Sequence, residues 1–331
     1  MTSTTFVTGG TGFLGRHLIP ALCRAGHHVR VLARHPDAHL WLKRYPNVEI
    51  VQGDVLDAAS LRPAMRGCAY VIHAAGLFRF WGEQALFDET NVGGTENVLK
   101  AVVDGQRVLY ISTVALIGTP SGIVDELHPA QPTDNYQRSK YKAEQLALRY
   151  HAEHGVPLIV LRPGAFYGPF GTYAFNRLFF RDPMRGIIMQ INGGSYITFP
   201  AYIGDVAQAI VRALTAGRPG EIYNVCGETL THKAAFDIIT REAQLWYPRL
   251  NIPDWLGEAF ARLLTGVAYV TRQEPFYPIT LRSYVYNDWR VSSEKAQREL
   301  GFVPTPFIEG ARRTIAWYRA GQPDMLPEVE C

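Results

Sequence analysis

Cysteine is scarce in this chain of 331 residues. The four cysteines, Cys23, Cys68, Cys226 and Cys331, lie far apart and form no CxxC or other metal-ligand spacing. We therefore expect no metal site. Sparse cysteines without a pairing pattern are typical of a reducing compartment, so we expect a cytoplasmic protein.

The chain also lacks a long apolar run and an excess of charge of one sign. No span of about 20 apolar residues occurs, and the N-terminus has no signal-peptide pattern, so neither a membrane-spanning nor a secreted protein is expected. The formal net charge of +3 is spread along the chain. Because no basic stripe is present, we expect no nucleic-acid partner. The hydrophobic content of 47% is enough for a large core.

In the first half of the chain, short β-branched runs alternate with amphipathic stretches of helical length. Strands are predicted at Thr4–Thr8, His28–Ala33, Val48–Gln52, Tyr70–His73, Arg107–Ser112 and Pro157–Leu161. Helices are predicted at Phe13–Ala25, Ala58–Arg66, Phe87–Val103 and Asn135–His154. This alternation is typical of βαβ units, and right-handed crossovers would wind them into a Rossmann-type, doubly wound parallel sheet of the α/β class.

Beyond Gly168 the alternation weakens and aromatic residues become frequent. We predict a smaller C-terminal substrate lobe from residues 169–197 and 227–331. A helix at Ile203–Ala216 and a strand at Glu221–Val225 are expected to return to the main sheet. The dinucleotide-binding domain would then comprise residues 1–168 with returns at about 198–226, and the lobe would be interleaved with it.

A glycine-rich segment, TGGTGFLG, follows the first predicted strand and opens the first helix. Glycine at these positions allows a tight turn, close approach of a pyrophosphate and packing of the helix on the strand, while the helix N-terminus faces the phosphates. The alternative is a tight turn without a ligand. The residues predicted to contact a dinucleotide here are Gly9, Thr11, Gly12, Phe13, Leu14 and Gly15.

The ends of the next strands indicate which dinucleotide binds. The second strand ends at Arg34 rather than at an acidic residue. A basic residue suits a 2′-phosphate, so NADP is favoured and NAD remains open; the alternative is a solvated surface arginine. Asp54 and Val55 close the third strand, where the carboxylate could meet an adenine amino group or simply cap the next helix. After the fourth strand, the small residues Ala74, Ala75 and Gly76 would let the backbone run close to the cofactor.

A tyrosine and a lysine four residues apart, Tyr136 and Lys140, share one face of a predicted helix. The preceding strand ends in Ser112 and Thr113, whose side chains should face opposite ways. We assign Thr113 to the site and keep Ser112 as the alternative. Transfer of a hydride at a carbinol carbon needs proton transfer at its oxygen, and a nearby ammonium would lower the pKa of the phenol for that task.

These motifs together resemble the extended short-chain dehydrogenases/reductases of the NAD-dependent epimerase/dehydratase superfamily, and the resemblance covers almost the whole chain. It includes TGGTGFLG, GDV at 53–55, HAAG at 73–76, NVGGT at 91–95, YxxxK at 136–140 and RPGAFYGP at 162–169. The resemblance implies that Asn91 supports the active site, that Pro163 and Gly164 lie near the nicotinamide, and that the protein forms a homodimer through helices. Where dehydratases of this superfamily have an acidic pair, the chain has Val114 and Ala115, so dehydratase activity is not expected.

The substrate side of the predicted site is mostly aromatic and apolar. The residues predicted to contact substrate are Phe78, Phe80, Trp81, Ala115, Phe166 and Tyr167. We therefore predict an NADP-dependent oxidoreductase for a hydrophobic secondary alcohol or ketone, similar to the dihydroflavonol-reductase and 3β-hydroxysteroid-dehydrogenase branches. The alternatives are an NAD-dependent sugar-nucleotide epimerase and a cofactor-binding protein without catalysis.

Apolar residues recur at helical spacing between Trp255 and Val267. We expect this face to pack on the substrate lobe, since core-facing helices show the same period. Contact of the face with a membrane surface is the alternative.

Overall fold

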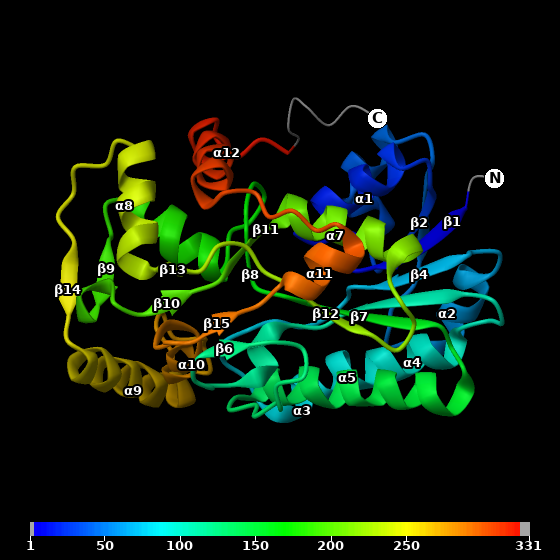
Figure 1. Cartoon of the computed structure of the whole chain (residues 1–331), viewed down its shortest axis with the longest axis horizontal. Helices are drawn as coiled ribbons and strands as arrows, with labels where there is room; N and C mark the ends of the chain where they lie inside the picture. Colours follow the sequence, from blue (N-terminus) through cyan, green and yellow to red (C-terminus); the bar gives the residue numbers. More distant parts are fainter. Residues whose placement is uncertain (1–2, 325–331) are drawn as a thin grey trace.

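A seven-stranded parallel sheet forms the centre of the computed structural model, which describes residues 3–324 (Figure 1). The strands lie in the order β12 (Ile222–Val225), β7 (Leu158–Pro163), β5 (Arg107–Ile111), β4 (Tyr70–His73), β1 (Thr4–Thr8), β2 (His28–Ala33) and β3 (Val48–Gln52). The predicted bounds of the first four strands in the chain match these, and the others differ by one or two residues at their ends. The fold is the doubly wound α/β type that the sequence predicts.

Helices cover both faces of the sheet, and alternate strand residues point to opposite layers. On β1, Val7 packs in the layer of α1 (Gly15–Arg24), α7 (Ile203–Ala216) and α11 (Glu294–Leu300). Its neighbour Phe6 packs in the layer of α2 (Ala58–Met65), α4 (Gly94–Ala101) and α5 (Asn135–His154). Both side chains are fully buried, as expected for a parallel sheet covered on two sides.

The predicted helix at Phe87–Val103 is not one regular helix. It consists of α3 (Gln84–Phe87), a π-helical turn (Asp88–Gly93) and α4. Asn91, in the π-helical turn, is 1% exposed and bonds to groups outside the helix. Its amide donates to Leu77 O at 3.0 Å and to Ser139 Oγ at 2.8 Å. A wide turn that directs a polar side chain inward is a common use of π-helical geometry.

The remaining elements build the lobe on the carboxyl-end side of the sheet (Figure 1). Its strands are β8 (Ala165–Tyr167), β9 (Met189–Ile191), β10 (Ile197–Thr198), β11 (Pro200–Tyr202), β13 (Leu230–Thr231) and β14 (Leu250–Ile252), and two further short strands, β6 (Ile123–Val124) and β15 (Arg290–Val291), pair with each other. Its helices are α6 (Asp182–Met184), α8 (His232–Glu242), α9 (Asp254–Thr271), α10 (Arg282–Val285) and α12 (Phe307–Arg319).

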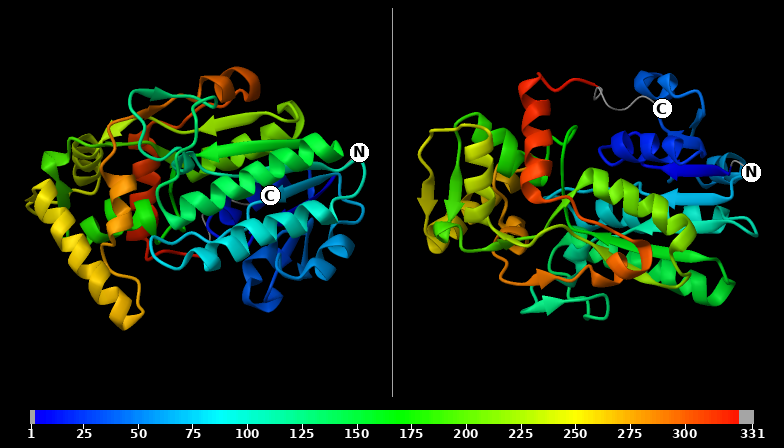
Figure 2. Two further views of the ribbon diagram at one scale, coloured as in Figure 1. Left: turned by 90° about the horizontal axis from the view of Figure 1, so that it is seen from below. Right: turned by 45° about the horizontal axis from the view of Figure 1, so that its top comes forward.

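Helix α9 lies at the outer edge of the lobe (Figure 2), and most of its large apolar side chains are exposed. Trp255 is 71% exposed and Leu263 is 65% exposed. The buried residues of the helix, Gly257, Ala261 and Ala268, are small and let it lie close against the lobe. Leu264 is partly buried there as well. The prediction that this face packs on the lobe is therefore wrong. Among residues 3–324, no helix is both long and apolar enough to cross a membrane.

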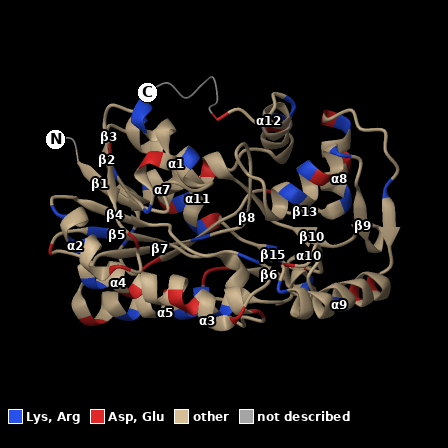
Figure 3. Ribbon diagram, turned by 180° about the vertical axis from the view of Figure 1, so that it is seen from behind, with Lys and Arg blue, Asp and Glu red and all other residues tan. Residues whose placement is uncertain are grey.

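Basic and acidic residues are interspersed along the helices (Figure 3). Within the described part of the chain, no group of three or more potential ligands is arranged to hold a metal ion. Cys23, Cys68 and Cys226 are buried, and Cys331 lies outside the described residues.

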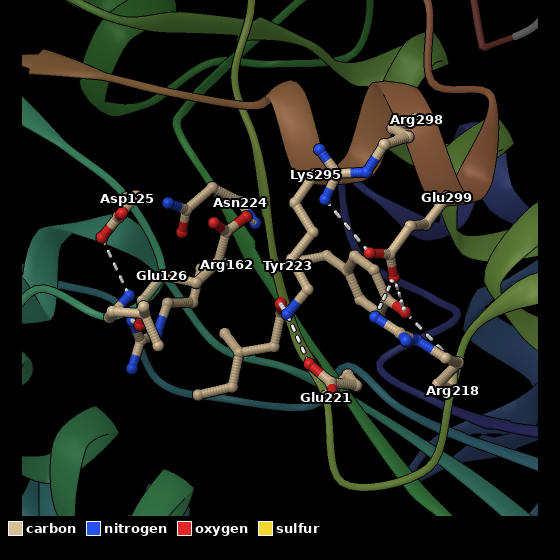
Figure 4. Close-up of polar contacts among 12 residues, drawn as sticks. Asp125, Glu126, Arg162, Arg218, Glu221, Tyr223, Asn224, Lys295, Arg298 and Glu299 are labelled. Atoms are coloured by element: carbon tan, nitrogen blue, oxygen red, sulfur yellow. Dashed lines mark hydrogen bonds and ion pairs between the residues drawn. The ribbon is translucent and has the colours of Figure 1, made fainter.

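The C-terminal segment returns to the sheet through α11, which packs on α7 and on the edge strand β12. Lys295 Nζ donates to Glu221 Oε2 at 2.6 Å and to Ile222 O at 2.7 Å (Figure 4). On the next turn of α11, Glu299 accepts a hydrogen bond from Tyr223 OH at 3.0 Å. Part of the segment assigned to the lobe thus covers the sheet. The division of the chain into two domains remains a prediction.

Candidate active site

A cavity of about 780 Å³ opens where the central strands of the sheet end. Most of the predicted site residues line it: Gly9, Thr11, Gly12, Phe13, Leu14, Arg34, Asp54, Val55, Ala74, Ala75, Gly76, Phe78, Phe80, Thr113, Ala115, Tyr136, Lys140, Pro163, Gly164 and Phe166. Residues more than 150 positions apart in the chain therefore form one site.

Two of the residues predicted to contact substrate do not line the cavity and have other surroundings. Tyr167 is 1% exposed and packs in an aromatic core, where its ring stacks on Phe180 with centroids 5.9 Å apart. Trp81 lies against Tyr269 of α9, with ring centroids 6.4 Å apart. Neither side chain is among those that line the cavity. The assignment of Tyr167 and Trp81 to the substrate is corrected accordingly.

The glycine loop is shaped by close backbone contacts. A Cβ on Gly9, whose φ is +72°, would lie 2.6 Å from the backbone of Ala74 and Ala75. A Cβ on Gly15 would lie 1.9 Å from Gly10 O, so Gly15 packs inside the loop and does not line the cavity. At Gly12 the nearest atom would be 3.4 Å away, which leaves open space on the cavity side. No side chain caps the N-terminus of α1.

A buried histidine that sequence reasoning missed holds the neighbouring loop in place. His73 Nδ1 and Thr8 Oγ1 are 2.7 Å apart, and His73 Nε2 lies 3.0 Å from Thr95 Oγ1. Ala75 N donates to Thr8 Oγ1 at 3.2 Å. Burial lowers the pKa of His73 to about 3, so the ring stays neutral and acts as a structural link between β1, β4 and α4.

Arg34 and Asp54 lie at the end of the cavity formed by β2 and β3. The Arg34 guanidinium is exposed, and it has no hydrogen-bond or ion-pair partner within residues 3–324. The next acidic residue along the chain, Asp37, pairs with Lys43 at 3.5 Å. Asp54 Oδ1 accepts a hydrogen bond from Leu56 N at 3.0 Å, as in a local turn.

The first turn of α5 places Tyr136. Asp134 caps the helix, since its Oδ1 accepts a hydrogen bond from Gln137 N at 2.8 Å. The Gln137 side chain in turn accepts from Thr133 N at 2.8 Å, which ties the residue before the cap to the first turn of the helix. Tyr136 then lies in the cavity wall, in contact with Phe78 at a ring-centroid distance of 4.6 Å and beside the Thr113 side chain.

Ser112 and Thr113 both line the cavity. The Thr113 side chain interacts with the Tyr136 phenol and accepts a hydrogen bond from Ala115 N at 3.2 Å. Ser112 Oγ is buried without a hydrogen-bond partner among the described residues. The arrangement favours Thr113 as the hydroxyl that works with Tyr136.

Burial controls the protonation of the tyrosine and the lysine. Desolvation raises the pKa of Tyr136 well above its usual value, and this outweighs the hydrogen bond with Thr113. The direction is opposite to the lowering expected from the sequence. Desolvation also lowers the pKa of Lys140 to about 7, although the charge of Glu144 raises it. Lys140 Nζ donates to Ile111 O at 2.7 Å and lies 4.4 Å from the centre of the Tyr110 ring.

Asn91 does not line the cavity but connects two elements that do. Its Oδ1 accepts a hydrogen bond from Leu77 N at 2.7 Å, on the loop after β4. Its amide donates to Ser139, which lies on α5 between the tyrosine and the lysine. Asn91 is therefore placed as a positioning residue behind the site.

The C-terminal lobe adds polar residues to the cavity that no pattern in the sequence indicated. Tyr284, Thr198 and His232 line it, together with the aromatic side chains of Phe175 and Phe179. The frequent aromatic residues beyond Gly168 indicated a lobe but could not show which of them face inward.

Comparison with known proteins places this site in a family. The family model for the NAD dependent epimerase/dehydratase family matches residues 5–226, which include the central sheet except for Thr4. The chain belongs to this family. It is an enzyme of the extended short-chain dehydrogenase/reductase type, as the motifs indicate.

Relatives within the epimerase/dehydratase family catalyse several reactions. The 4-hydroxy-2-methyl-3-oxo-4-farnesyl-3,4-dihydroquinoline-1-oxide ketoreductase of Stigmatella aurantiaca is 32% identical over 309 residues, which are 90% of this chain and 91% of that protein. The 3 beta-hydroxysteroid dehydrogenase type 7 of Mus musculus is 30% identical, with 95% of each chain covered. The crystal structure of the dTDP-glucose 4,6-dehydratase DesIV from Streptomyces venezuelae, with NAD and TYD bound, matches with a TM-score of 0.79 and 25% identity over 99% of this chain and 100% of that chain.

The residues present fit the nicotinamide dinucleotide that the family uses. Open space at Gly12, the uncapped N-terminus of α1 and the close approach of Gly9 to Ala74 form a cradle for an anionic phosphate group. Arg34 and Asp54 lie at one part of this cavity, and Tyr136 and Lys140 lie in another.

Proposed function

We propose that the protein is an NADP-dependent reductase or dehydrogenase acting on a hydrophobic ketone or secondary alcohol. The charge of the cavity lining carries this proposal. Among the described residues that line it, the only charged side chains are Arg34, Asp54 and Lys140. None of these comes from the lobe, so the lobe offers no cation to pair with a nucleotide diphosphate.

The arginines near the lobe side of the site are engaged elsewhere. Arg177 and Arg181 both bond to Asp182, at 3.3 Å and 3.1 Å, and neither lines the cavity. Phe166, Phe175 and Phe179 do line it. This lining suits an apolar substrate better than a sugar nucleotide, which is the alternative substrate class within the family.

In the proposed mechanism the nicotinamide supplies or accepts the hydride. Thr113 holds the substrate oxygen by a hydrogen bond, and the Tyr136 phenol gives that oxygen its proton during reduction or takes it during oxidation. Lys140 in its ammonium form stabilises the phenolate and counters the effect of burial on the tyrosine. Asn91 keeps α5 and the loop after β4 in register through its bonds to Ser139 and Leu77.

Arg34 supports the preference for NADP. Its unpaired guanidinium borders the cavity at the end of β2, and no acidic side chain among the lining residues lies on that strand end to hold a free ribose hydroxyl. The acidic residue nearest to Arg34 in the sequence, Asp37, is paired with Lys43. A 2′-phosphate would give Arg34 a charged hydrogen-bonding partner.

Two proposals about partners follow from the sequence. The resemblance predicts a homodimer, which sedimentation measurements of the purified protein would test. Contact of the α9 face with a membrane surface is the second; the exposure of Trp255 and Leu263 is compatible with it, and co-sedimentation with lipid vesicles tests it.

The first experiment is a fluorescence titration with NADPH and NADH, followed by a nicotinamide absorbance assay against apolar ketones and UDP-sugars. We expect tighter binding of NADPH and its consumption by an apolar ketone. Arg34→Ala should weaken NADPH binding roughly tenfold or more, consistent with loss of a charged hydrogen bond, and leave NADH binding unchanged. Arg62→Ala, at an exposed arginine of α2 outside the cavity, is the matched control.

Conversion of a UDP-sugar without net consumption of cofactor, together with tighter binding of NADH, would replace this proposal with the epimerase. Tyr136→Phe tests the proton transfer itself. We expect about a 10²–10⁴-fold loss in kcat with NADPH binding retained, since general acid–base catalysis contributes that much. Tyr150→Phe on the same helix, where Tyr150 packs on His154, should have full activity.

A further inference from the structure

His232 is a buried polar side chain in the cavity wall that has no polar partner. It is 4% exposed and lines the cavity. Its ring contacts that of Phe179 edge-on, with centroids 5.2 Å apart. Neither ring nitrogen is hydrogen-bonded to any residue in the described range 3–324. Burial lowers the pKa of His232 to about 4, so the ring is neutral at neutral pH and offers one N–H donor and one acceptor.

The backbone around His232 is firmly held. His232 N donates to Tyr196 O at 2.8 Å, which continues the antiparallel pairing of β10 with β13. Thr231 caps α8 by accepting a hydrogen bond from Ala234 N at 3.1 Å. The two strands lie side by side where α8 begins (Figure 1). The ring is therefore presented from a structured wall rather than from a loose loop.

A second polar group lies on the neighbouring strand. Thr198 of β10 is 5% exposed, lines the cavity and pairs with Leu230 of β13. Its hydroxyl has no hydrogen bond to any other side chain or backbone group of the described chain. The surrounding lining is apolar, with Phe175, Phe179 and Phe199. The polar atoms of His232 and Thr198 are not among the fully buried unpartnered atoms, and both residues line the cavity, so these atoms are available to bond to a polar group of a ligand there.

We propose that His232, assisted by Thr198, binds a hydroxyl or carbonyl oxygen of the substrate other than the oxygen that Tyr136 protonates. The substrate is then an apolar ketone or alcohol with a second oxygen function on the part of the molecule that the lobe encloses. This inference rests on the proposed function and specifies its substrate class. His232 comes from the lobe, whereas Tyr136 comes from α5 on the sheet, so one ligand has to span both.

The test compares a bicyclic ketone, decalone, with the same ketone carrying a hydroxyl group on its second ring. For the native enzyme with NADPH, we expect kcat/KM to be at least tenfold higher for the hydroxylated compound, about the value of one hydrogen bond. His232→Leu should lower kcat/KM for the hydroxylated ketone about tenfold, mainly through KM, and leave decalone unchanged. His232→Gln, which retains a donor and an acceptor, should restore part of the difference.

Phe179→Leu is the control on the same wall, because it changes shape without removing a polar group and should affect both ketones alike. NADPH titration of each variant shows whether the fold and the cofactor site are intact. An equal effect of His232→Leu on both compounds, or no effect on either, would overturn the inference.

If the native enzyme reduces neither ketone, the proposed function fails for this class, and the inference is then judged by binding alone. Calorimetric titration of both compounds into the NADP-loaded native enzyme and His232→Leu gives that comparison. If the hydroxylated ketone binds more tightly than decalone to the native enzyme but not to His232→Leu, the role of His232 is supported. If the two ketones bind equally to the native enzyme, the role is rejected.

Discussion

Lys140 shows how strongly the surroundings of one residue affect its charge. The amine is buried against the Tyr110 ring and bonds to a backbone carbonyl, so desolvation lowers its pKa from 10.5 to about 7. Near neutral pH the residue therefore exists in both protonation states. The ammonium form that the proposed mechanism needs becomes more populated as the pH falls through 7.

This pKa shift predicts the pH dependence of stability. Between pH 7 and 10.5 the unfolded chain holds a proton on Lys140 that the folded protein has lost, so the free energy of unfolding should rise with pH. The contribution is at most about 1.4 kcal/mol per pH unit. Lys140→Met has no titratable amine at this position, so its free energy of unfolding should not show the rise that Lys140 causes. Relative to the native protein, the variant should therefore be stabilised most at the lower pH, which urea unfolding at pH 7–9 measures.

Lys142→Met is the matched control, because Lys142 lies on the same helix but is 50% exposed and pairs with Asp88. Its effect on the free energy of unfolding should not change over this pH range. A pH-independent difference between the native protein and Lys140→Met would contradict the lowered pKa.

At the scale of elements, the turn from β1 into α1 contains glycines with different tasks. Gly15→Ala would drive a Cβ into Gly10 O, within 1.9 Å, so the turn itself has to move. Gly12→Ala meets nothing closer than 3.4 Å but fills the space on the cavity side. We expect Gly12→Ala to unfold at nearly the native temperature yet bind NADPH at least tenfold more weakly, by about 1.4 kcal/mol.

Gly15→Ala should instead lower the free energy of unfolding by about 3 kcal/mol or more, as substitutions that force a backbone clash do. Thermal unfolding and NADPH titration of the two variants separate the effects. Equal loss of stability in both would show that Gly12 has no separate role toward the ligand.

The orientation of α9 predicts a second contrast between elements. Leu263→Gln, at a site 65% exposed, should change the free energy of unfolding by less than about 0.5 kcal/mol. Ala261→Leu, at a site 2% exposed, should cost about 1–3 kcal/mol because the helix packs closely there. Denaturant unfolding measures both, and the reverse order would mean that the apolar face is buried after all.

For the whole molecule, the interleaving of the dinucleotide-binding part and the lobe predicts that the chain unfolds as one cooperative unit. Ala296, Leu300 and Phe302 from the C-terminal segment belong to the same core as α1 and α7. Lys295 and Glu299 attach that segment to β12. Calorimetry should therefore show a single unfolding transition, and a fragment ending at residue 226 should not fold alone, since it would expose this core. Two separate transitions would contradict the prediction.

The sequence by itself was sufficient for the features that depend on local pattern. Alternating apolar runs predicted the first four strands of the chain at their observed bounds. Glycine spacing predicted the turn before α1, and helical spacing placed Tyr136 and Lys140 on one wall. These features follow from backbone geometry and side-chain period, which a single segment already contains.

Only the tertiary structure decided which way a side chain faces where the local apolar pattern fits the core, the cavity and the surface equally well. Tyr167 is in the core although Phe166 lines the cavity, and α9 turns its large apolar side chains outward because small residues face the lobe. His232 and Thr198 gave no signal in the sequence, since only the pairing of β10 with β13 brings them together. Exposure and contact across such distances depend on the packing of other segments, which no local periodicity describes.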